Sequence, residues 1–341
     1  MSLATQMRPK TFDEVVGQHI NVKILQKQCE TRDFAGAYLF VGSSGCGKTT
    51  VAKLLANQIN LGIGEPIEID AASNGGVDAI RNIVADASTR SLDGSEYKIF
   101  IIDEVQSITS AGWQAFLKCI EEVTKYTIFI FCTTEEQKVP ETIKNRCMRF
   151  YFSKIPTKEI IKRLDEVCLK ANINCSTEAK AYIAMLAKGC MREAISLLEK
   201  VASTNTTITI QDAIETLGDF SYNAMFNLTN AIIDKNKGYI LKMIDDIYNN
   251  GKDLKLFIDQ YLGFVLDLNK YALYHDISLT DIPASLEVVA NDSHCVRYIT
   301  DYVTADWLSK LSESILDLKA ILRNDTFYKS TIEVHLTKLC N

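Results

Sequence analysis

Residues 42–50 read Gly-Ser-Ser-Gly-Cys-Gly-Lys-Thr-Thr and follow the apolar run Tyr38–Val41. This G-x-x-x-x-G-K-T spacing, placed between a strand-like run and the helical stretch Thr49–Ile59, is typical of a phosphate-binding loop. Its glycines accept backbone angles that a Cβ forbids, so successive N–H groups can turn towards an anion. A glycine-rich turn with an incidental lysine is the plainer interpretation, and the flanking strand and helix count against it. The sequence therefore predicts a strand–loop–helix unit that binds a nucleoside triphosphate.

The loop residues share one expected role, which is to bind the phosphates of the nucleotide. They are Gly42, Ser43, Ser44, Gly45, Cys46, Gly47, Lys48, Thr49 and Thr50. Lys48 supplies a point charge for the β- and γ-phosphates, and the Thr49 hydroxyl is placed to ligate Mg²⁺. The helix that starts near Lys48 points the positive end of its dipole at the same anion.

Short apolar strand candidates alternate with helical patterns over residues 1–155. The candidates are Ala37–Val41, Pro66–Asp70, Tyr97–Asp103, Tyr126–Thr133 and Met148–Phe152. This alternation predicts an α/β domain with a parallel sheet. After Pro156 the strand patterns stop and amphipathic helical patterns replace them. We therefore predict three domains: an α/β nucleotide-binding domain over 1–155, a small helical domain over 156–218 and an all-helical C-terminal domain over 219–341.

A second half of the site follows the run Lys98–Ile102, whose lack of alternation indicates a strand buried on both faces. Asp103 and Glu104 stand at its carboxyl end, the edge at which ligands sit in an open α/β sheet. Asp103 can hold Mg²⁺ beside Thr49, and Glu104 can polarise the attacking water. An isolated Asp-Glu pair would be a solvated strand end, but its position after a buried strand and a phosphate-binding loop favours the functional interpretation.

Three further polar residues are weaker signals. Thr134 follows the next strand candidate, Arg146 lies near the end of the α/β domain, and Arg192 opens a helix of the second domain. A polar side chain at the tip of the adjacent strand could reach the γ-phosphate, although strands often end in threonine. Each arginine, taken alone, is more often solvated or ion-paired than functional.

Bulk composition narrows the class of protein. The chain has 341 residues, of which 47% are hydrophobic and 23% charged, as in soluble globular proteins. No apolar run approaches the ~18 residues that span a bilayer, and the N-terminus lacks the apolar core of a signal peptide, so we expect a cytoplasmic protein without membrane contact.

The ten cysteines show no C-x-x-C spacing, so no zinc site and no structural disulfide is expected. With a net charge of −6, any contact with nucleic acid must be local or shared among subunits.

Segments in order over residues 7–200 resemble the ATPase subunits of sliding-clamp loaders in the AAA+ superfamily, and most of all the bacterial DNA polymerase III gamma/tau family. The matching segments are Arg8–Gln18, Ala37–Phe40, the phosphate-binding loop, Ile69–Asn74, Ile101–Val105, Thr133–Glu135, Arg146–Cys147 and Met191–Leu198. The remaining residues match in length and helical character, as a collar domain would. The resemblance implies an α/β AAA+ domain, a helical lid domain and a helical collar domain.

The resemblance also implies a role for each matching position. The residues that would line the adenine site are Arg8, Pro9, Val16 and Gly17. Thr134 matches the polar group called sensor 1, and Arg192 matches sensor 2, which reaches the γ-phosphate from the lid. Arg146 matches the arginine finger, which acts in trans on ATP bound to a neighbouring subunit. Together with Lys48 and Glu104, these three residues form the expected catalytic set.

The function that the resemblance implies is that of an ATP hydrolase with Mg²⁺ as its metal. ATP binding would assemble the chain with other clamp-loader subunits in a pentamer-like complex. The assembly would open a sliding clamp and bind primer–template DNA, and hydrolysis would release the clamp on the DNA during replication.

Several departures from the family pattern leave alternatives open. The four-cysteine zinc module is missing, because only Asn60–Glu65 stands in its place. Asn145 replaces the serine of the finger motif, Gly75 stands where a DNA-facing arginine is common, and Gln106 stands where histidine is frequent. These departures motivate the alternative of a nucleotide-binding scaffold with little hydrolysis. A related AAA+ remodeller of Holliday junctions or other DNA is a third hypothesis, and the long helical segment after residue 220, in place of a winged-helix domain, counts against it.

Overall fold

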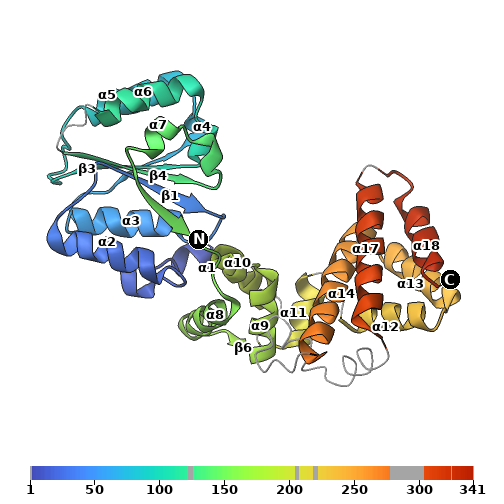
Figure 1. Cartoon of the computed structure of the whole chain (residues 1–341). Helices are drawn as coiled ribbons and strands as arrows, with labels where there is room; N and C mark the ends of the chain where they lie inside the picture. The colour runs from blue at the N-terminus through green and yellow to red at the C-terminus, as the bar shows by residue number, and fades with distance from the viewer. Residues whose placement is uncertain are drawn as a thin grey trace. The chain divides into compact units, whose positions relative to one another are not determined.

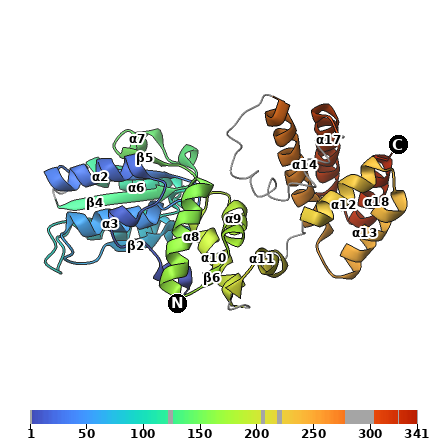
Figure 2. The ribbon, with the colours of Figure 1, turned by 90° about the horizontal axis from the view of Figure 1, so that it is seen from below.

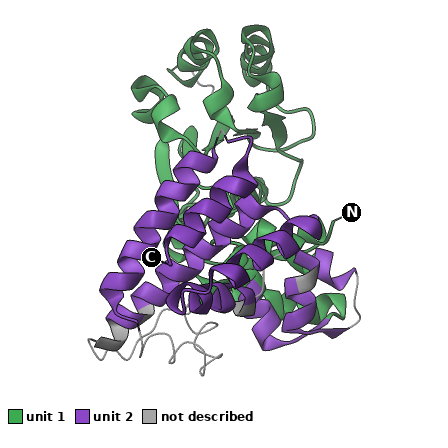
Figure 3. Ribbon diagram, turned by 90° about the vertical axis from the view of Figure 1, so that its right-hand side faces the viewer, with its two compact units in different colours: residues 1–173, 183–199 green, residues 174–182, 200–341 purple. Residues whose placement is uncertain are grey.

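The computed structural model of the chain describes residues 2–121, 126–203, 207–217, 222–276, 303–323 and 325–340. The chain divides into two compact units (Figure 3). Unit 1 holds residues 1–173 and 183–199, and unit 2 holds residues 174–182 and 200–341. The three-domain division stays a prediction, and residues 218–221 at its second boundary lie outside the described part.

Unit 1 is built on a five-stranded, wholly parallel sheet with the strand order β2-β3-β4-β1-β5 (Figure 1). The strands are β1 (Ala37–Gly42), β2 (Ile67–Asp70), β3 (Lys98–Asp103), β4 (Thr127–Thr133) and β5 (Met148–Phe152). All five predicted strands are confirmed. Because β1, β3 and β4 lie inside the sheet, both of their faces are buried, which explains the absence of alternation in their sequences.

Helices cover both faces of this sheet, so unit 1 has three layers (Figure 1). The covering helices are α2 (His19–Thr31) and α3 (Lys48–Ile59) on one face, and α5 (Val77–Ala87), α6 (Ser110–Glu121) and α7 (Glu141–Lys144) on the other. Successive strand residues point to opposite faces. In β1, Tyr38 and Phe40 therefore pack in the core beneath α2 and α3, whereas Leu39 and Val41 pack in the core beneath α5 and α6.

The carboxyl ends of the parallel strands meet at one edge of the sheet. There β1 leads into the phosphate-binding loop, β3 ends at Asp103, and β4 ends at Thr133. Unit 1 also contains short elements, namely α1 (Leu3–Gln6), η1 (Phe12–Glu14), α4 (Ala71–Asn74), η2 (Val105–Ser107) and η3 (Glu136–Lys138). This edge is the position at which an open α/β sheet binds its ligands.

Helices dominate after Pro156, as predicted (Figure 2). They are α8 (Thr157–Ala171), α9 (Thr177–Leu186), α10 (Met191–Ala202) and α11 (Ile210–Leu217). The expectation that strands stop there is wrong in one detail, because β6 (Asn174–Cys175) and β7 (Thr207–Ile208) pair in parallel. Two-residue strands are too short to leave a periodic pattern, and only the tertiary fold brings them together. Thr209 and Asp212 cap the start of α11, since each backbone N–H donates to the other residue's side chain.

From residue 222 onwards, the described part of unit 2 is helical. Its helices are α12 (Tyr222–Ile233), α13 (Lys237–Asn249), α14 (Leu254–Asp276), α17 (Ala305–Leu322) and α18 (Tyr328–Lys338). They share a core that contains Phe257, Tyr261 and Leu308. The Tyr261 hydroxyl lies 3.0 Å from the hydroxyl of Thr229, and burial raises the pKa of Tyr261. Among the described helices, none is both long enough and apolar enough to cross a membrane.

Candidate nucleotide-binding site

The phosphate-binding loop joins the carboxyl end of β1 to the first residue of α3. Gly45 has a φ of +69° and Gly47 a φ of +107°, both in the left-handed region that favours glycine. A Cβ on Gly45 would lie only 2.1 Å from the Sγ atom of Cys190, just before α10. The glycine at position 45 is thus required twice, for its backbone angle and for the close approach of the chain beside it.

Lys48 is the charged residue of this loop, and it is only 6% exposed. Its Nζ atom donates to the carbonyl oxygens of Gly42, at 2.8 Å, and Ser43, at 2.9 Å. These two carbonyls hold the ammonium group against the loop. A phosphate in the loop would therefore meet a positive charge that is already in position.

Thr49 and Asp103 meet across the carboxyl edge of the sheet, as the sequence predicts. The Thr49 Oγ1 atom donates to Asp103 Oδ2 at 2.6 Å, joining the start of α3 to the end of β3. A hydroxyl and a carboxylate are the hard oxygen ligands that suit Mg²⁺, which takes few ligands from the protein and keeps several waters. In the part of the chain that the structure describes, no group of three or more His, Cys, Asp or Glu side chains is placed to hold a metal ion.

A pocket of about 890 Å³, open to solvent, lies over the loop in unit 1. Its lining includes the predicted residues Ser44, Gly45, Cys46, Gly47, Lys48, Thr49, Thr50, Arg8, Pro9, Val16, Asp103, Glu104 and Arg192. Five other predicted residues are not part of this lining: Gly17, Gly42, Ser43, Thr134 and Arg146. The structure thus brings most of the predicted set around one cavity.

The N-terminal segment around Arg8 and Pro9 is held in place by Arg163 of α8, which the sequence analysis did not single out. Arg163 is 4% exposed and lines the pocket. It donates to the carbonyl oxygen of Met7 at 2.9 Å and pairs with Glu166 at 2.5 Å. A signal was present in the sequence, because Arg163 lies on the same helical stripe as the buried residues Ile160 and Val167. A charged residue on a buried stripe needs partners, and Met7 and Glu166 supply them.

Gln18 is a second residue that the sequence analysis left without a role. Its side chain is buried, and its Nε2 atom donates to the carbonyl oxygens of Cys46, at 3.2 Å, and Ser153, at 2.8 Å. One amide group therefore ties the N-terminal segment to the phosphate-binding loop and to the residue after β5. Nothing in the local sequence pattern marks this role, because both partners are distant in the chain.

Two side chains near the pocket have shifted pKa values. The backbone N–H of Lys10 donates to Glu14 at 2.7 Å and lowers the pKa of that carboxyl group, so Glu14 brings a negative charge to the pocket wall. Burial raises the pKa of the Cys46 thiol, whose Sγ atom donates to the carbonyl oxygen of Ser43. Cys46 therefore acts as a small packing residue of the loop.

Glu104 and Thr134 are brought close by a residue between them in space. Glu104 has a φ of +53°, and its own N–H donates to Asp103 Oδ1 at 3.0 Å, which turns the side chain out of the strand direction. Gln106 contacts both the Glu104 carboxylate and, at 3.2 Å, the Thr134 hydroxyl. Glu104 lines the pocket, whereas Thr134 lies outside its lining and is connected to Glu104 through Gln106.

Arg192 stands at the start of α10, directly beside the phosphate-binding loop. The backbone N–H of Met191 donates to the carbonyl oxygen of Gly45 at 3.1 Å, which fixes the start of the helix on the loop. Arg192 itself is exposed and lines the pocket. The helix start therefore delivers one more positive charge to the phosphate side of the cavity.

Arg146 lies at the opposite edge of the sheet. It precedes β5, whose register pairs Met148 with Tyr38 and Phe152 with Gly42 at the loop, so at least about 13 Å of strand separates Arg146 from the loop edge. It donates to the carbonyl oxygen of Thr142 at 2.7 Å and pairs with Glu121 at 2.5 Å, with 39% of its side chain exposed. Arg146 therefore does not serve the pocket of its own chain.

Comparisons with known proteins identify the family that this chain resembles. The family model described as DNA polymerase III, delta subunit matches residues 65–156. The DNA polymerase III subunit tau of Bacillus subtilis is 34% identical over 98% of this chain and 62% of that protein. The gamma/tau subunit of Mycoplasma genitalium is 31% identical over 80% of this chain and 50% of that protein. The chain is a relative of the DNA polymerase III gamma/tau subunits. The predicted family resemblance is confirmed.

The relatives also set a limit on what the comparison covers. The chain spans between half and about three fifths of the length of the two relatives named above. Among solved structures, the RuvB Holliday junction branch migration motor of Thermotoga maritima superposes with a TM-score of 0.53, at 18% identity, over 75% of this chain and 90% of that chain. At so low an identity, this likeness supports the fold alone.

Proposed function

We propose that the chain is an ATP-hydrolysing subunit of a sliding-clamp loader that acts in DNA replication. The observation that carries the proposal is the 2.6 Å contact between Thr49 and Asp103 beside the phosphate-binding loop, in a pocket that Glu104 also lines. The similarity to the tau subunit of Bacillus subtilis over 98% of the chain supports it.

In this proposal, ATP binds with its phosphates on the N–H groups of the loop and on Lys48. Thr49 and Asp103 are the residues that fit Mg²⁺, and bound Mg²⁺ offsets the negative charge of the phosphates. Glu104 orients and deprotonates the attacking water, while Arg192 contacts the γ-phosphate as sensor 2. The remaining adenine contacts come from the segment that contains Arg8, Pro9, Val16 and Gly17.

We assign Arg146 to the ATP site of a neighbouring subunit. Its position at the edge of the sheet opposite the phosphate-binding loop supports this role, because a residue at that edge cannot reach its own pocket. An arginine supplied in trans stabilises the charge of the transition state and couples hydrolysis to assembly. The proposed partners are other clamp-loader subunits, the sliding clamp and primer–template DNA. Residues 156–218 are the proposed lid, and residues 219–341 the proposed collar.

The test of this function is ATP turnover by the reconstituted assembly with clamp and primed DNA. We expect Arg146→Ala to lower turnover at least about a hundredfold, because the transition-state charge loses its partner, while ATP affinity stays within about twofold. Arg149→Ala is the matched control, since Arg149 is an exposed arginine of β5 that pairs with Glu136. Turnover by Arg146→Ala at the unmutated rate would refute the trans role.

A nucleotide-binding scaffold with little hydrolysis is the second candidate. The departures at Gly75, Gln106 and Asn145 favour it, whereas Glu104 in the pocket lining counts against it. The scaffold function is preferred if the assembly binds ATP but its ATP turnover is near zero and does not change when primed DNA is added.

A further inference from the structure

The side chain of Gln106 connects the ends of two strands at the edge of the pocket. Gln106 lies in η2, two residues after Glu104. Its Nε2 atom donates to Oε2 of Glu104 and, at 3.2 Å, to Oγ1 of Thr134. Its Oε1 atom accepts from Oγ1 of Thr133 at 2.8 Å. One amide group therefore joins the carboxylate at the end of β3 to both threonines at the end of β4.

The Thr133 hydroxyl and the Glu104 carboxylate, which only accepts, together determine which way this amide faces. Thr133 is fully buried, and its hydroxyl oxygen accepts from the backbone N–H of Glu135 at 3.0 Å. The hydroxyl proton is then donated to the oxygen of the Gln106 amide. With its oxygen taken by Thr133, the amide presents its NH₂ group to Glu104.

The contact holds one oxygen of a carboxylate whose backbone is already restrained. Glu104 has a left-handed φ of +53°, and its N–H is bonded to Asp103. Its side chain lines the pocket, whereas Gln106 is not part of the pocket lining. Gln106 thus contacts Glu104 from outside the pocket lining.

We propose that Gln106 is a positioning residue for Glu104, holding one carboxylate oxygen so that the side chain faces the attacking water. This inference rests on the proposed ATP hydrolysis at the same site. A carboxylate that samples other rotamers spends less time in the geometry needed for proton transfer, and such geometry is worth orders of magnitude in rate. Because Gln106 acts through Glu104 and does not touch ATP, its loss lowers kcat and leaves KM unchanged.

The sharpest variant is Gln106→Glu, which keeps the size of the side chain and an acceptor for Thr133 but replaces the NH₂ donor with an oxygen that repels Glu104. We expect its kcat for ATP hydrolysis by the reconstituted assembly with clamp and primed DNA, measured with excess ATP, to fall about tenfold, while KM and ATP affinity stay within about twofold. The kcat of Gln106→Met is expected to fall by a similar factor. Gln106→His, whose neutral ring offers one donor and one acceptor, is expected to recover turnover relative to Gln106→Met.

Thr133→Val tests the orientation step, because it removes the hydroxyl and keeps the shape of the side chain. If Thr133 acts through Gln106, then Thr133→Val lowers kcat when it is introduced into the wild-type chain. The same substitution does not lower kcat further when Gln106→Met is already present. Additive effects in the double variant would contradict this pathway. Gln137→Glu, at an exposed glutamine near the same edge, is the control for added negative charge, and thermal unfolding checks that each variant is folded.

Glu104→Gln separates failure of the inference from failure of the proposed function. One possible outcome is that the wild type hydrolyses ATP, that Glu104→Gln does not, and that Gln106→Glu keeps the wild-type kcat. This outcome refutes the role of Gln106 and leaves the proposed function standing. If Glu104→Gln hydrolyses ATP like the wild type, or the wild type shows no hydrolysis, both are refuted.

Discussion

Gly45 is a single residue on which the geometry of the phosphate-binding loop depends. Its φ of +69° lies where a Cβ is strained, and a Cβ there would meet Cys190 Sγ at 2.1 Å. The spacing of the motif predicts a glycine-rich turn, but it does not say which glycine is crowded or by what. Only the tertiary structure names Cys190 as the neighbour.

At the residue scale we predict that Gly45→Ala weakens ATP binding at least about tenfold, because the strained loop moves its N–H groups away from the phosphates. Titration calorimetry with Mg²⁺ and ATP measures the effect. Cys190→Ala in the same chain removes the Sγ atom and leaves the Cβ at an ordinary 3.4 Å, so the double variant should bind more tightly than Gly45→Ala. The control is Gly62→Ala, at φ +79° with no atom within 4 Å of its Cβ, which should leave ATP binding unchanged. Equal affinity of Gly45→Ala and the wild type would refute the steric argument.

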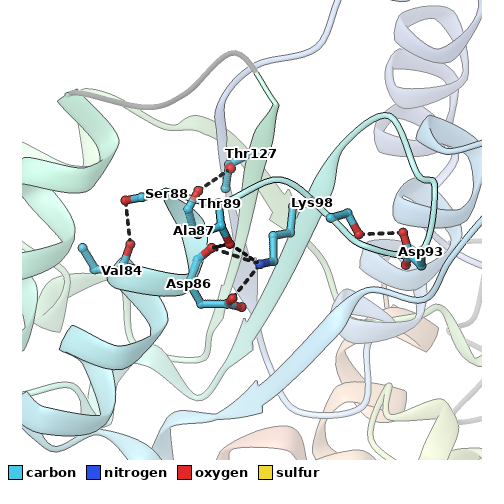
Figure 4. A network of polar contacts seen from close by, with 9 residues as sticks. Val84, Asp86, Ala87, Ser88, Thr89, Asp93, Lys98 and Thr127 are labelled. Atoms are coloured by element: carbon cyan, nitrogen blue, oxygen red, sulfur yellow. Dashed lines mark hydrogen bonds and ion pairs between the residues drawn. The ribbon is translucent and has the colours of Figure 1, made fainter.

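At the scale of an element, a network of polar contacts fixes the end of α5 to the start of β3 (Figure 4). The Lys98 Nζ atom donates to the carboxylate of Asp86 at 2.6 Å, to the backbone oxygen of Asp86 at 3.0 Å and to Thr89 Oγ1 at 3.1 Å. Thr127 of β4 donates to the carbonyl oxygen of Ala87 at 2.8 Å. The last carbonyls of the helix are thus satisfied by two strands of the sheet, which keeps α5 on the sheet.

We predict that Lys98→Met destabilises unit 1 by about 1–2 kcal/mol, because the Asp86 carboxylate and the Thr89 hydroxyl lose a charged donor whose side chain is only 10% exposed. Urea unfolding measures the change. Arg81→Met on the same helix is the comparison, since its ion pair with Asp78 is exposed on both sides and should change stability by less than about 0.5 kcal/mol. If both variants lose the same stability, the network does not anchor α5.

At the scale of the whole molecule, the chain has separate hydrophobic cores in its two units. Two clusters on the faces of the sheet belong to unit 1, and a third cluster of α12 to α18 belongs to unit 2. All residues that line the candidate pocket belong to unit 1. Ligand binding should therefore stabilise one core directly and not the other.

We predict two unfolding transitions in differential scanning calorimetry. Adding Mg²⁺ with ATP should raise the midpoint temperature of only one of them. A ligand at a hundred times its Kd adds about 2.7 kcal/mol to the unit that binds it. Lys48→Ala should abolish this ATP-dependent rise in midpoint temperature and leave the midpoint of the second transition unchanged. A single transition that moves as a whole on adding ATP would contradict the independence of the two cores.

The fold of unit 1 could be predicted from sequence because its inner strands β1, β3 and β4 are buried on both faces and its loop has a fixed spacing. The run Lys98–Asp103 and the G-x-x-x-x-G-K-T motif are local signals, since burial and backbone angle act on neighbouring residues. The pair β6 and β7 escaped prediction because two residues carry no period. The likeness to RuvB shows the fold alone, and one fold can serve many functions, so the specific family came from the motifs together and not from the architecture.

The sequence by itself determined the residue types of the candidate site: the loop, Thr49, Asp103 and Glu104, whose chemistry and spacing are local properties. The tertiary structure alone decided which distant residues act on them. Arg163 and Gln18 hold the N-terminal segment, Gln106 joins Glu104 to Thr133, and Arg146 lies at the far edge of the sheet. The physical reason is that hydrogen bonds between strand ends and helix starts depend on which elements the packing of the core places side by side, and local sequence patterns carry no record of that packing.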